Sequence, residues 1–280
     1  MEAKATLRRV SACHAEAFVV GRLDVFFSMS SHRFYISPNE WNLDALVLSG
    51  TEAHHAGNVL RLKRGAKVSL FNGHGREVTA EVVHFARDEI RLRKLHQVET
   101  APLRCRITLG QAIPKGRNMD LIVQKAVEIG ASSIVPLISE RTIVDLDPKE
   151  AAQKQAKWQQ VAIEAAKQSG QNWLPQIHVP RKLKDFFAQA SGDMAFDIRL
   201  IGSLQPDARH LKKILANYQN MHGDRPASVL MLIGPEGDFT PAELALAKSQ
   251  GCLPITLGPI ILRVETAAIY CLSVLSYELL

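Results

Sequence analysis

The residues after Pro102 alternate apolar segments with amphipathic segments, and this alternation limits the fold more than any other feature of the chain. Five of the apolar segments have the length of buried strands: "CRITLGQAI", "SSIVPLIS", "DIRLIGS", "SVLMLIG" and "PITLG". Strands that alternate with helices predict a parallel α/β sheet. The segment "SVLMLIG" is apolar on both faces, which is typical of a central parallel strand. We therefore expect an α/β domain over residues 102–280.

Two helices of this domain have start signals in the sequence. Asp147 is placed to cap a helix in which Pro148 takes the first position and Glu150 completes a capping box. This helix is expected to end at Gly170, because glycine readily adopts the left-handed conformation that follows a last turn. The segment "TPAE" at 240–243 has the same cap, proline and acidic residue, so it predicts a second helix start.

Residues 32–101 are rich in predicted strands and join the α/β domain near 97–103. The segment "KVSLFNGHGREVTAEVVHF" predicts two strands around an Asn-Gly-His-Gly turn. The segment "TEAHHAGNVLRLKRG" predicts a short helix with Thr51 as its N-cap. Together these segments predict a small β-barrel with one helix. The basic residues of the barrel form either an RNA-facing surface or a solvated exterior: Arg61, Lys63, Arg64, Lys67, Arg91, Arg93 and Lys94.

The composition of the chain limits the kinds of partner and the cellular compartment that we expect. The chain has 34 Lys+Arg against 28 Asp+Glu, a formal net charge of +6, which fits RNA but also many unrelated basic proteins. The four cysteines have no C-x-x-C spacing, so we expect no metal site or disulfide framework, and a reducing compartment such as the cytoplasm. The apolar runs are too short to span a membrane. Residues 1–31 have no signal-peptide pattern and are expected to form a poorly ordered extension.

Two predicted strands near the carboxy terminus end in the same way, at Gly-Pro, in "LIGPEGDF" and "LGPIILR". The carboxyl ends of parallel strands are where open α/β sheets bind ligands, and glycines there allow a ligand to approach the backbone. Neither segment is a P-loop or a G-x-G-x-x-G motif. The first segment is therefore either a tight turn or, with the second, one wall of a pocket.

The last predicted helix, "VETAAIYCLSVLSYELL", is apolar around most of its circumference. Such a helix is buried in its own domain or covered by another subunit. Arg263 and Glu265 lie at its entrance among apolar residues. Because unpaired charges are costly there, we expect them either to face a ligand or partner or to form an ion pair with each other.

These motifs resemble a known family. "LIGPEGDF" and "LGPIILRVETAA" are similar to the signature of the ribosomal RNA uridine-N3 methyltransferases, which act on small-subunit (16S) rRNA and belong to the knotted SPOUT class. Further blocks resemble the family in the same order, over about residues 32–280: "HRFYI", "EAHHAGNVLRLKRGAKVSLFNGHG", "ITLGQAIPKGRNMDLIVQKAVEIGASSIVPLISERT" and "EAAKQSGQNWLPQI".

The resemblance implies a PUA-like β-barrel that binds RNA, followed by a trefoil-knotted α/β domain that binds S-adenosylmethionine. It also implies a homodimer with the pocket near the dimer interface, and a role in ribosome biogenesis. By position in the motifs, the residues around the methyl donor would be Leu232, Ile233, Gly234, Gly237, Leu257, Gly258, Ile261, Leu262, Arg263, Thr266 and Ala267.

The chain departs from the family pattern at four places. The family usually has Gly where Asp238 stands, Arg where Ile260 stands and Thr where Val264 stands. It usually has an Arg after "QSG", whereas this chain has Gln171-Asn172. Lost phosphate contacts would then fall to a neighbouring cation, Lys167 or Arg263. These departures concern the substrate side of the site more than the fold.

Methyl transfer to uridine N3 requires loss of the imide proton, so the site needs a base or cations near the carbonyl oxygens. Arg263 is expected to stabilise the developing charge, with Glu265 or Glu236 as base or orienting group; a purely structural Glu265 is the alternative. Lys115, Arg117 and Arg141 follow strands of the α/β domain and are expected to contact RNA with Arg61, Lys63 and Arg64 of the barrel. Arg33 either joins them or pairs with an acidic residue.

Two other functions fit the sequence less well. One is an RNA-binding or ribosome-assembly protein with an inactive knot domain, which the changes at Asp238 and Ile260 suggest. The other is a knotted methyltransferase that acts on another RNA site.

Overall fold

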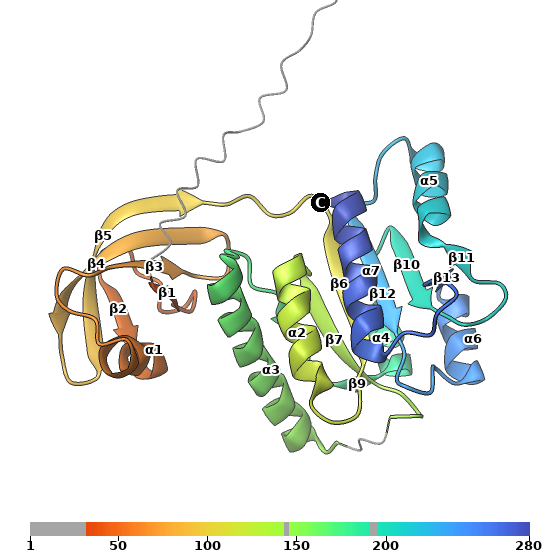
Figure 1. Cartoon of the computed structure of the whole chain (residues 1–280), viewed down its shortest axis with the longest axis horizontal. Coiled ribbons are helices and arrows are strands. Elements are labelled where there is room, and N and C mark those ends of the chain that lie inside the picture. Colours follow the sequence, from red (N-terminus) through yellow and green to blue (C-terminus); the bar gives the residue numbers. More distant parts are fainter. Residues whose placement is uncertain (1–31, 143–145, 191–194) are drawn as a thin grey trace, which may run out of the picture. The chain divides into compact units, whose positions relative to one another are not determined.

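The computed structural model describes residues 32–142, 146–190 and 195–280 (Figure 1). The extension expected over residues 1–31 lies outside the described residues. None of the helices in the described ranges combines the length and the apolar content that a membrane crossing requires.

The first part is a mixed five-stranded sheet in the order β1-β3-β4-β5-β2. Strand β1 is parallel to β3, and the other pairs are antiparallel. The predicted hairpin is confirmed, since β3 and β4 flank the turn at residues 72–75. Because β1 and β2 are the two edges, the sheet is curled but has no ladder that closes it within the described residues. The elements are β1 (His32–Tyr35), β2 (Leu46–Ser49), α1 (Gly50–His54), the π-helical turn η1 (His55–Val59), β3 (Lys67–Phe71), β4 (Arg76–Phe85) and β5 (Glu89–Glu99).

The helix between β2 and β3 differs from the sequence-based expectation. Its N-cap position is Ser49, not Thr51, and no side chain caps it. The chain passes from the last residue of β2 straight into α1, so Thr51 already lies in the first turn. The helix then widens into η1, and the backbone leaves it at Arg61, where φ is 51°.

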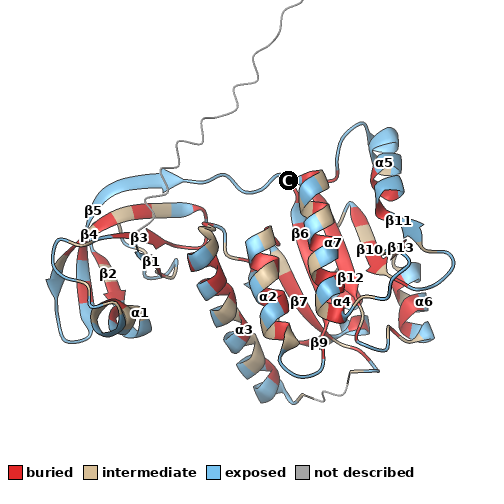
Figure 2. Cartoon of the chain, in the orientation of Figure 1, coloured by how far each residue is buried: buried red, intermediate tan, exposed pale blue. Residues whose placement is uncertain are grey.

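The second part is an eight-stranded, all-parallel sheet, as predicted. Its order is β11-β13-β10-β12-β6-β7-β8, with β9 also paired to β7. Strand β12 lies between β10 and β6, and all six of its residues are buried, as its apolar sequence predicted (Figure 2). The strands are β6 (Arg106–Ala112), β7 (Ser133–Ile138), β8 (Gln176–Ile177), β9 (Arg181–Lys182), β10 (Ile198–Gly202), β11 (Arg209–His210), β12 (Ser228–Ile233) and β13 (Leu253–Thr256).

Helices cover both faces of this sheet. One core cluster packs residues of α2, α3, α5 and α7 against one face, and another packs α4 and α6 against the other face (Figure 1). Both predicted capping boxes are present, at Asp147 with Glu150 and at Thr240 with Glu243. Gly170 ends α3 with a φ of 73°. The helices are α2 (Asn118–Ile129), α3 (Pro148–Ser169), α4 (Leu183–Ala190), α5 (Leu211–His222), α6 (Pro241–Ser249) and α7 (Val264–Leu279).

Candidate functional site

A cavity of about 500 Å³ lies at the carboxyl ends of β10, β12 and β13, which are neighbours in the sheet. Gly234 and Gly258 both line it, so the two Gly-Pro segments form walls of one pocket. A ligand site at this edge agrees with the general rule for open parallel sheets. The segment between β13 and α7 lines the cavity, and α7 then packs against α2, β6 and β12.

Glycine is required at these two positions for different physical reasons. A Cβ atom on Gly234 would lie 3.1 Å from the backbone nitrogen of Phe239 and 3.2 Å from Oδ1 of Asp238, so a larger residue would displace the following turn. Gly258 has a φ of 106°, a conformation that side chains with a Cβ rarely adopt. Both substitutions would therefore disturb the cavity wall.

Most of the eleven residues that the family resemblance implied for the donor line this cavity. Those that do are Ile233, Gly234, Leu257, Gly258, Ile261, Leu262, Arg263 and Ala267. The structure does not bring Leu232, Gly237 and Thr266 to the cavity wall. Successive side chains of a strand point to opposite faces, so Leu232 packs into the core beneath α4 and α6 and is fully buried. Gly237 lies instead beside Arg141, and Thr266 is exposed on α7.

Sequence reasoning missed one wall of the cavity and one polar residue. The missed wall follows the end of β10 and contains Gly202, Ser203 and Leu204. The segment "DIRLIGS" was recognised as a strand, and the rule that located the other two walls applies to its carboxyl end as well. Asn118, at the start of α2, was also missed, because the order of strands along the sheet decides which helix start faces the cavity.

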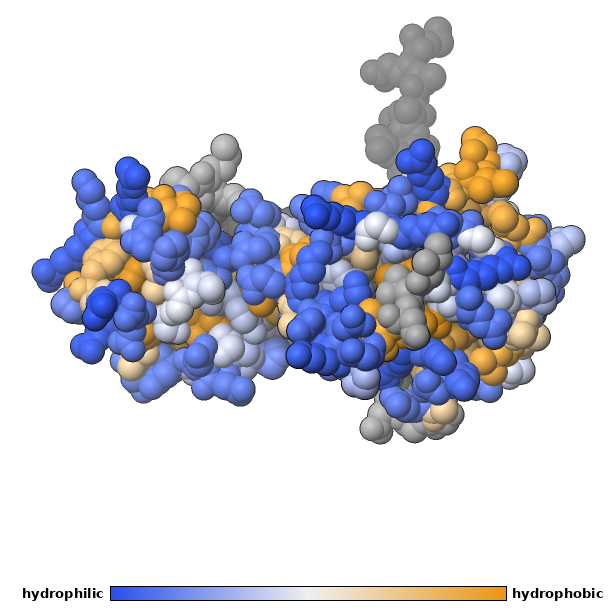
Figure 3. Space-filling view, turned by 90° about the horizontal axis from the view of Figure 1, so that it is seen from below, coloured by the Kyte–Doolittle hydropathy of each residue, from blue (hydrophilic) through white to orange (hydrophobic). Residues whose placement is uncertain are grey.

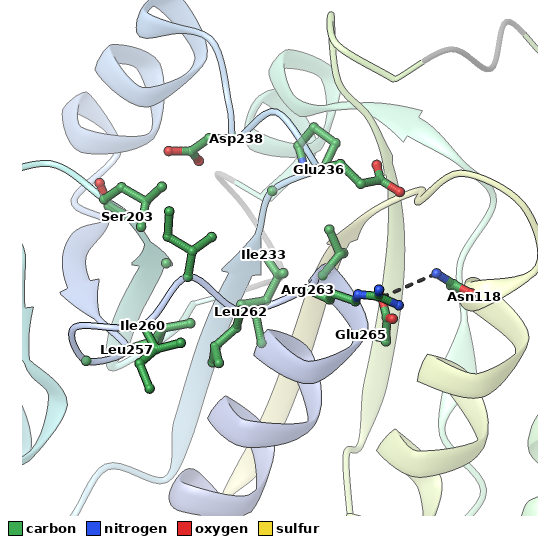
Figure 4. A pocket seen from close by; sticks show the side chains of 18 residues that line it. Asn118, Ser203, Ile233, Glu236, Asp238, Leu257, Ile260, Leu262, Arg263 and Glu265 are labelled. Carbon is green, nitrogen blue, oxygen red and sulfur yellow. Dashed lines mark hydrogen bonds between the residues drawn. The ribbon is translucent and has the colours of Figure 1, made fainter.

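Arg263 and Glu265 lie on the side of the cavity next to Asn118, and Leu257 and Ile260 lie on the opposite side (Figure 4). Asp238 lies apart from these two charges, towards Ser203. Nδ2 of Asn118 donates a hydrogen bond to Oε2 of Glu265 across 3.3 Å. The structure shows no ion pair between Arg263 and Glu265 within the described ranges, so the helix-start pair is not the explanation of these charges. Oε1 of Glu236 accepts a hydrogen bond from the backbone nitrogen of Lys115 at 2.8 Å.

The departure at Asp238 has a structural explanation. Its φ is 62°, in the left-handed region that favours glycine, and Asp is among the few other residues that tolerate this region. Oδ1 of Asp238 also accepts a hydrogen bond from the backbone nitrogen of Phe239 at 2.8 Å. The turn after β12 therefore keeps the conformation that glycine would give it. Ile260 is 73% exposed and Val264 is buried, and both line the cavity.

Six of the seven basic residues proposed for RNA are exposed: Arg61, Lys63, Arg64, Lys115, Arg117 and Arg141. Arg33 is different, since its side chain is only 11% exposed. It donates to the carbonyl oxygen of Gln171 at 2.9 Å, lies over the ring of Phe71 and pairs with Glu77 at 3.3 Å. Burial lowers the pKa of Arg33, although Glu77 opposes this shift. Arg33 is therefore withdrawn as an RNA contact; the alternative, a pair with an acidic residue of the barrel, is confirmed.

Lys167 is also unavailable to a phosphate group. Its side chain is 5% exposed, and Nζ lies 2.7 Å from Oε1 of Glu52 and 2.9 Å from Oε1 of Glu164. The expectation that Lys167 compensates for a missing basic residue is therefore wrong. On the barrel, hydrophilic side chains cover much of the face that Figure 3 shows, interrupted by apolar patches.

Comparison with known proteins assigns the chain to a family. A model described as an RNA methyltransferase domain matches residues 101–276. The chain belongs to the RNA methyltransferase family. A second family model, an RNA methyltransferase PUA domain, matches residues 48–95.

Relatives with experimental and curated descriptions agree with this family. A curated relative from Bacillus subtilis, ribosomal RNA small subunit methyltransferase E, is 29% identical over 82% of this chain and 89% of its own length. The solved structure of the same-named protein from Neisseria gonorrhoeae, bound to S-adenosyl methionine, has a TM-score of 0.76 and 30% identity and covers 89% of this chain and 98% of that chain. A Legionella pneumophila protein solved with bound SAM reaches a TM-score of 0.79 at 33% identity, over 89% of this chain and 98% of that one. The expected SPOUT-class α/β fold with a PUA-like N-terminal part is therefore confirmed.

Proposed function

We propose that this RNA methyltransferase transfers the methyl group of S-adenosylmethionine to N3 of a uridine in small-subunit (16S) ribosomal RNA. The observation that carries the proposal is the cavity of about 500 Å³ in which both Gly-Pro segments meet. Its position in the fold, at the carboxyl ends of three parallel strands, is the position at which such sheets bind nucleotides. The fold is shared with two proteins that were solved with this donor, and curated relatives are named for small-subunit rRNA.

The residues of the cavity fit the donor chemically. Gly234 allows the turn at residues 235–239 to pack closely against the end of β12, which shapes the cavity wall. The apolar side chains of Ile233, Leu257 and Leu262 suit an adenine ring, and Ser203 and the backbone around Gly258 suit its polar edges and the ribose. The bound donor would supply an electrophilic methyl group on a sulfonium. Leu232, Gly237 and Thr266, which do not line the cavity, are not retained as donor contacts.

Three charged residues support the chemistry at the acceptor. Uridine N3 carries a proton in its neutral form, and removing this proton leaves negative charge on the adjacent carbonyl oxygens. Arg263 lines the cavity without an ion-pair partner in the described parts of the chain, so its guanidinium is available to stabilise that charge. Glu236 serves as base or orienting group. Glu265 accepts a hydrogen bond from Asn118 in the wall of the cavity, so we assign it an orienting role.

A homodimer is proposed from a separate observation, the exposed apolar residues near the carboxy terminus. Ile260, Ile261, Tyr270 and Tyr277 are 73%, 78%, 47% and 87% exposed, and they lie in or just before α7, whose residues are mostly apolar. A second copy that covers these residues would form a homodimer with the cavity next to the interface. We place the RNA-binding barrel at 32–101 and the methyltransferase domain at 102–280, and the proposed rRNA substrate places the activity in the cytoplasm.

The decisive experiment is nucleoside mass spectrometry of rRNA from a deletion strain. Loss of N3-methyluridine, with return when the gene is restored, is the expected result. Persistence of N3-methyluridine at the wild-type level would contradict the uridine assignment and favour another RNA site. Calorimetry with S-adenosylmethionine tests the donor separately: wild type should bind, and Gly234→Val should not bind while the barrel stays folded. A folded wild-type protein without donor binding would favour an RNA-binding protein that lacks catalysis.

A further inference from the structure

A second, smaller cavity of about 230 Å³ adjoins the site described above. Glu236 lines both cavities, so the two cavities adjoin at this residue. The second cavity lies beyond the ends of β6 and β7, which are adjacent strands. Its lining residues are Ile113, Pro114, Lys115, Gly116, Arg141, Thr142 and Glu236.

The lining of this cavity has the polarity that a nucleotide requires. Lys115 and Arg141 are exposed cations that come from two different loops and meet at one opening. Ile113 and Pro114 are buried and supply an apolar surface. The one acidic side chain in the lining, Glu236, has Oε1 engaged by the backbone nitrogen of Lys115 and shows no hydrogen bond at Oε2 within the described ranges. Cations at the rim and an apolar surface inside match a phosphate with an attached base.

Arg141 is held in place by a buried network. The carboxylate of Glu243, which is 7% exposed, accepts hydrogen bonds from Oγ of Ser139 at 2.9 Å and from the backbone nitrogen of Glu140 at 3.0 Å. The same carboxylate closes the capping box of α6. Nη1 of Arg141 donates to the carbonyl oxygen of Gly237. The loop after β7 is therefore fixed to the turn that forms the wall of the first cavity, so the cation does not depend on a ligand for its position.

The volume of the cavity selects the ligand. About 230 Å³ is below the range of about 300–1,000 Å³ for sites that hold drug-sized molecules. It suits one nucleobase and excludes paired RNA. Enzymes that modify a base commonly take it out of the stack and place it in such a pocket. A base in this cavity would lie against Glu236, at the boundary that the cavity shares with the donor cavity, so its N3 could face the methyl group directly.

We propose that the second cavity receives the extruded pyrimidine nucleotide of the RNA substrate, with its phosphate between Lys115 and Arg141 and with its base beside Glu236, where the acceptor and donor cavities adjoin. This inference rests on the proposed function. It assigns Lys115 and Arg141 to a single phosphate beside the reacting base, whereas Arg117 does not line the cavity and remains a candidate contact to RNA outside it.

The test uses uridine 5′-monophosphate as the probe. Binding to the full chain is followed by NMR saturation transfer in the presence of S-adenosylhomocysteine, and the dissociation constant of S-adenosylhomocysteine is measured by calorimetry. Lys115→Ala with Arg141→Ala should weaken binding of the nucleotide at least about tenfold, the effect of losing hydrogen bonds to charged groups. The affinity for S-adenosylhomocysteine should fall less than the affinity for the nucleotide, because neither residue lines the donor cavity and Arg141 reaches its wall only through the carbonyl oxygen of Gly237. Lys115→Ala alone, which keeps that bond, should leave the affinity for S-adenosylhomocysteine within about twofold. The matched control is Arg209→Ala with Lys213→Ala, which removes the same charge from exposed positions on β11 and α5.

Each outcome has a defined meaning. A loss of nucleotide binding in the first variant but not in the control supports the acceptor site, and weaker binding of uridine without its phosphate supports the role of the cations. Equal nucleotide binding by wild type and variant, or no saturation transfer in wild type at millimolar nucleotide, overturns the inference and leaves the donor site intact. Failure of wild type to bind S-adenosylhomocysteine instead counts against the proposed function itself.

Discussion

Nζ of Lys167 lies 2.7 Å from Oε1 of Glu52, and this ion pair joins the last turns of α3 to α1, a helix more than a hundred residues earlier in the chain. The two side chains are 5% and 15% exposed. Burial raises the pKa of Glu52, and the hydrogen bond and charge of Lys167 oppose that shift. The pair therefore connects the curled sheet with the α/β part in surroundings where a single charge would be costly.

Replacement of one partner should destabilise the protein more than replacement of both. We expect Lys167→Met to lower the free energy of unfolding by about 2 kcal/mol, because it leaves Glu52 buried without its cation. Glu52→Gln with Lys167→Met should recover most of this loss. Urea unfolding of the two single variants and the double variant gives the coupling. Additive single effects would show that the pair does not act as a unit.

The left-handed backbone at Asp238 predicts an unusual order of substitutions. Asp238→Ala should be destabilising by about 1 kcal/mol, because alanine has neither the freedom of glycine nor a side chain that accepts from Phe239. Asp238→Gly should be closer to wild type, since it relieves the backbone while losing the same hydrogen bond. Thermal unfolding and donor affinity should both follow this order. A Gly variant that is worse than the Ala variant would contradict the backbone explanation.

The surroundings of His178 predict that the folded protein loses stability in mild acid. Its Nε2 lies 2.9 Å from Oγ of Ser133, and burial, with a smaller effect of Arg181, lowers its pKa from the ordinary value of 6.5. The unfolded chain therefore takes up a proton below about pH 6.5 before the folded chain does. The stabilising contribution is complete above that pH and is lost as the pH falls towards the folded pKa.

The measurement is urea unfolding at about pH 7.5 and about pH 5.5. The decrease in unfolding free energy from the higher to the lower pH should be smaller in His178→Gln than in wild type. His96→Gln, at an exposed position of β5, is the control and should keep the wild-type decrease. An identical decrease in all three proteins would remove His178 as its source.

The described cysteines should be unreactive in the folded protein. Burial raises the pKa of Cys105 to about 11 and that of Cys252 and Cys271 to about 12. Because the thiolate is the reacting form, a Cys13→Ser variant should react with a thiol reagent only after unfolding. Cys13 lies outside the described residues and is removed so that its reaction does not obscure the result. Rapid labelling of the native variant would contradict the burial of these thiols.

The exposed cations between η1 and β3 should contribute to RNA affinity through phosphate contacts. Arg61→Glu with Lys63→Glu should weaken RNA binding and reduce the slope of log affinity against log salt by about 2. Lys212→Glu with Lys213→Glu changes the net charge equally at exposed positions of α5 and should leave the slope near its wild-type value. A slope unaffected by the first pair would show that this surface does not contact RNA.

Features that depend on neighbouring residues were predictable from the sequence. The capping boxes at Asp147 and Thr240, the end of α3 at Gly170 and the turn at 72–75 each depend on a few consecutive side chains. The helix after β2 was predicted, but its cap was not, because the strand before it sets where the first turn begins. A local signal such as Thr51 is overruled when the tertiary path of the chain decides the boundary.

The candidate site also has some features that the sequence predicts and others that depend on the tertiary structure. The sequence by itself determined that two buried strands end at Gly-Pro and that Arg263 and Glu265 follow, because apolar length and turn residues are local properties. Only the tertiary structure decided that the end of β10 forms a third wall, that Leu232 faces away, and that Arg33 is bound between Phe71 and Gln171. It also decided that Lys115 and Arg141 meet beside Glu236. The physical reason is that strand order and pairing register bring distant residues together, and neither is encoded in a short segment.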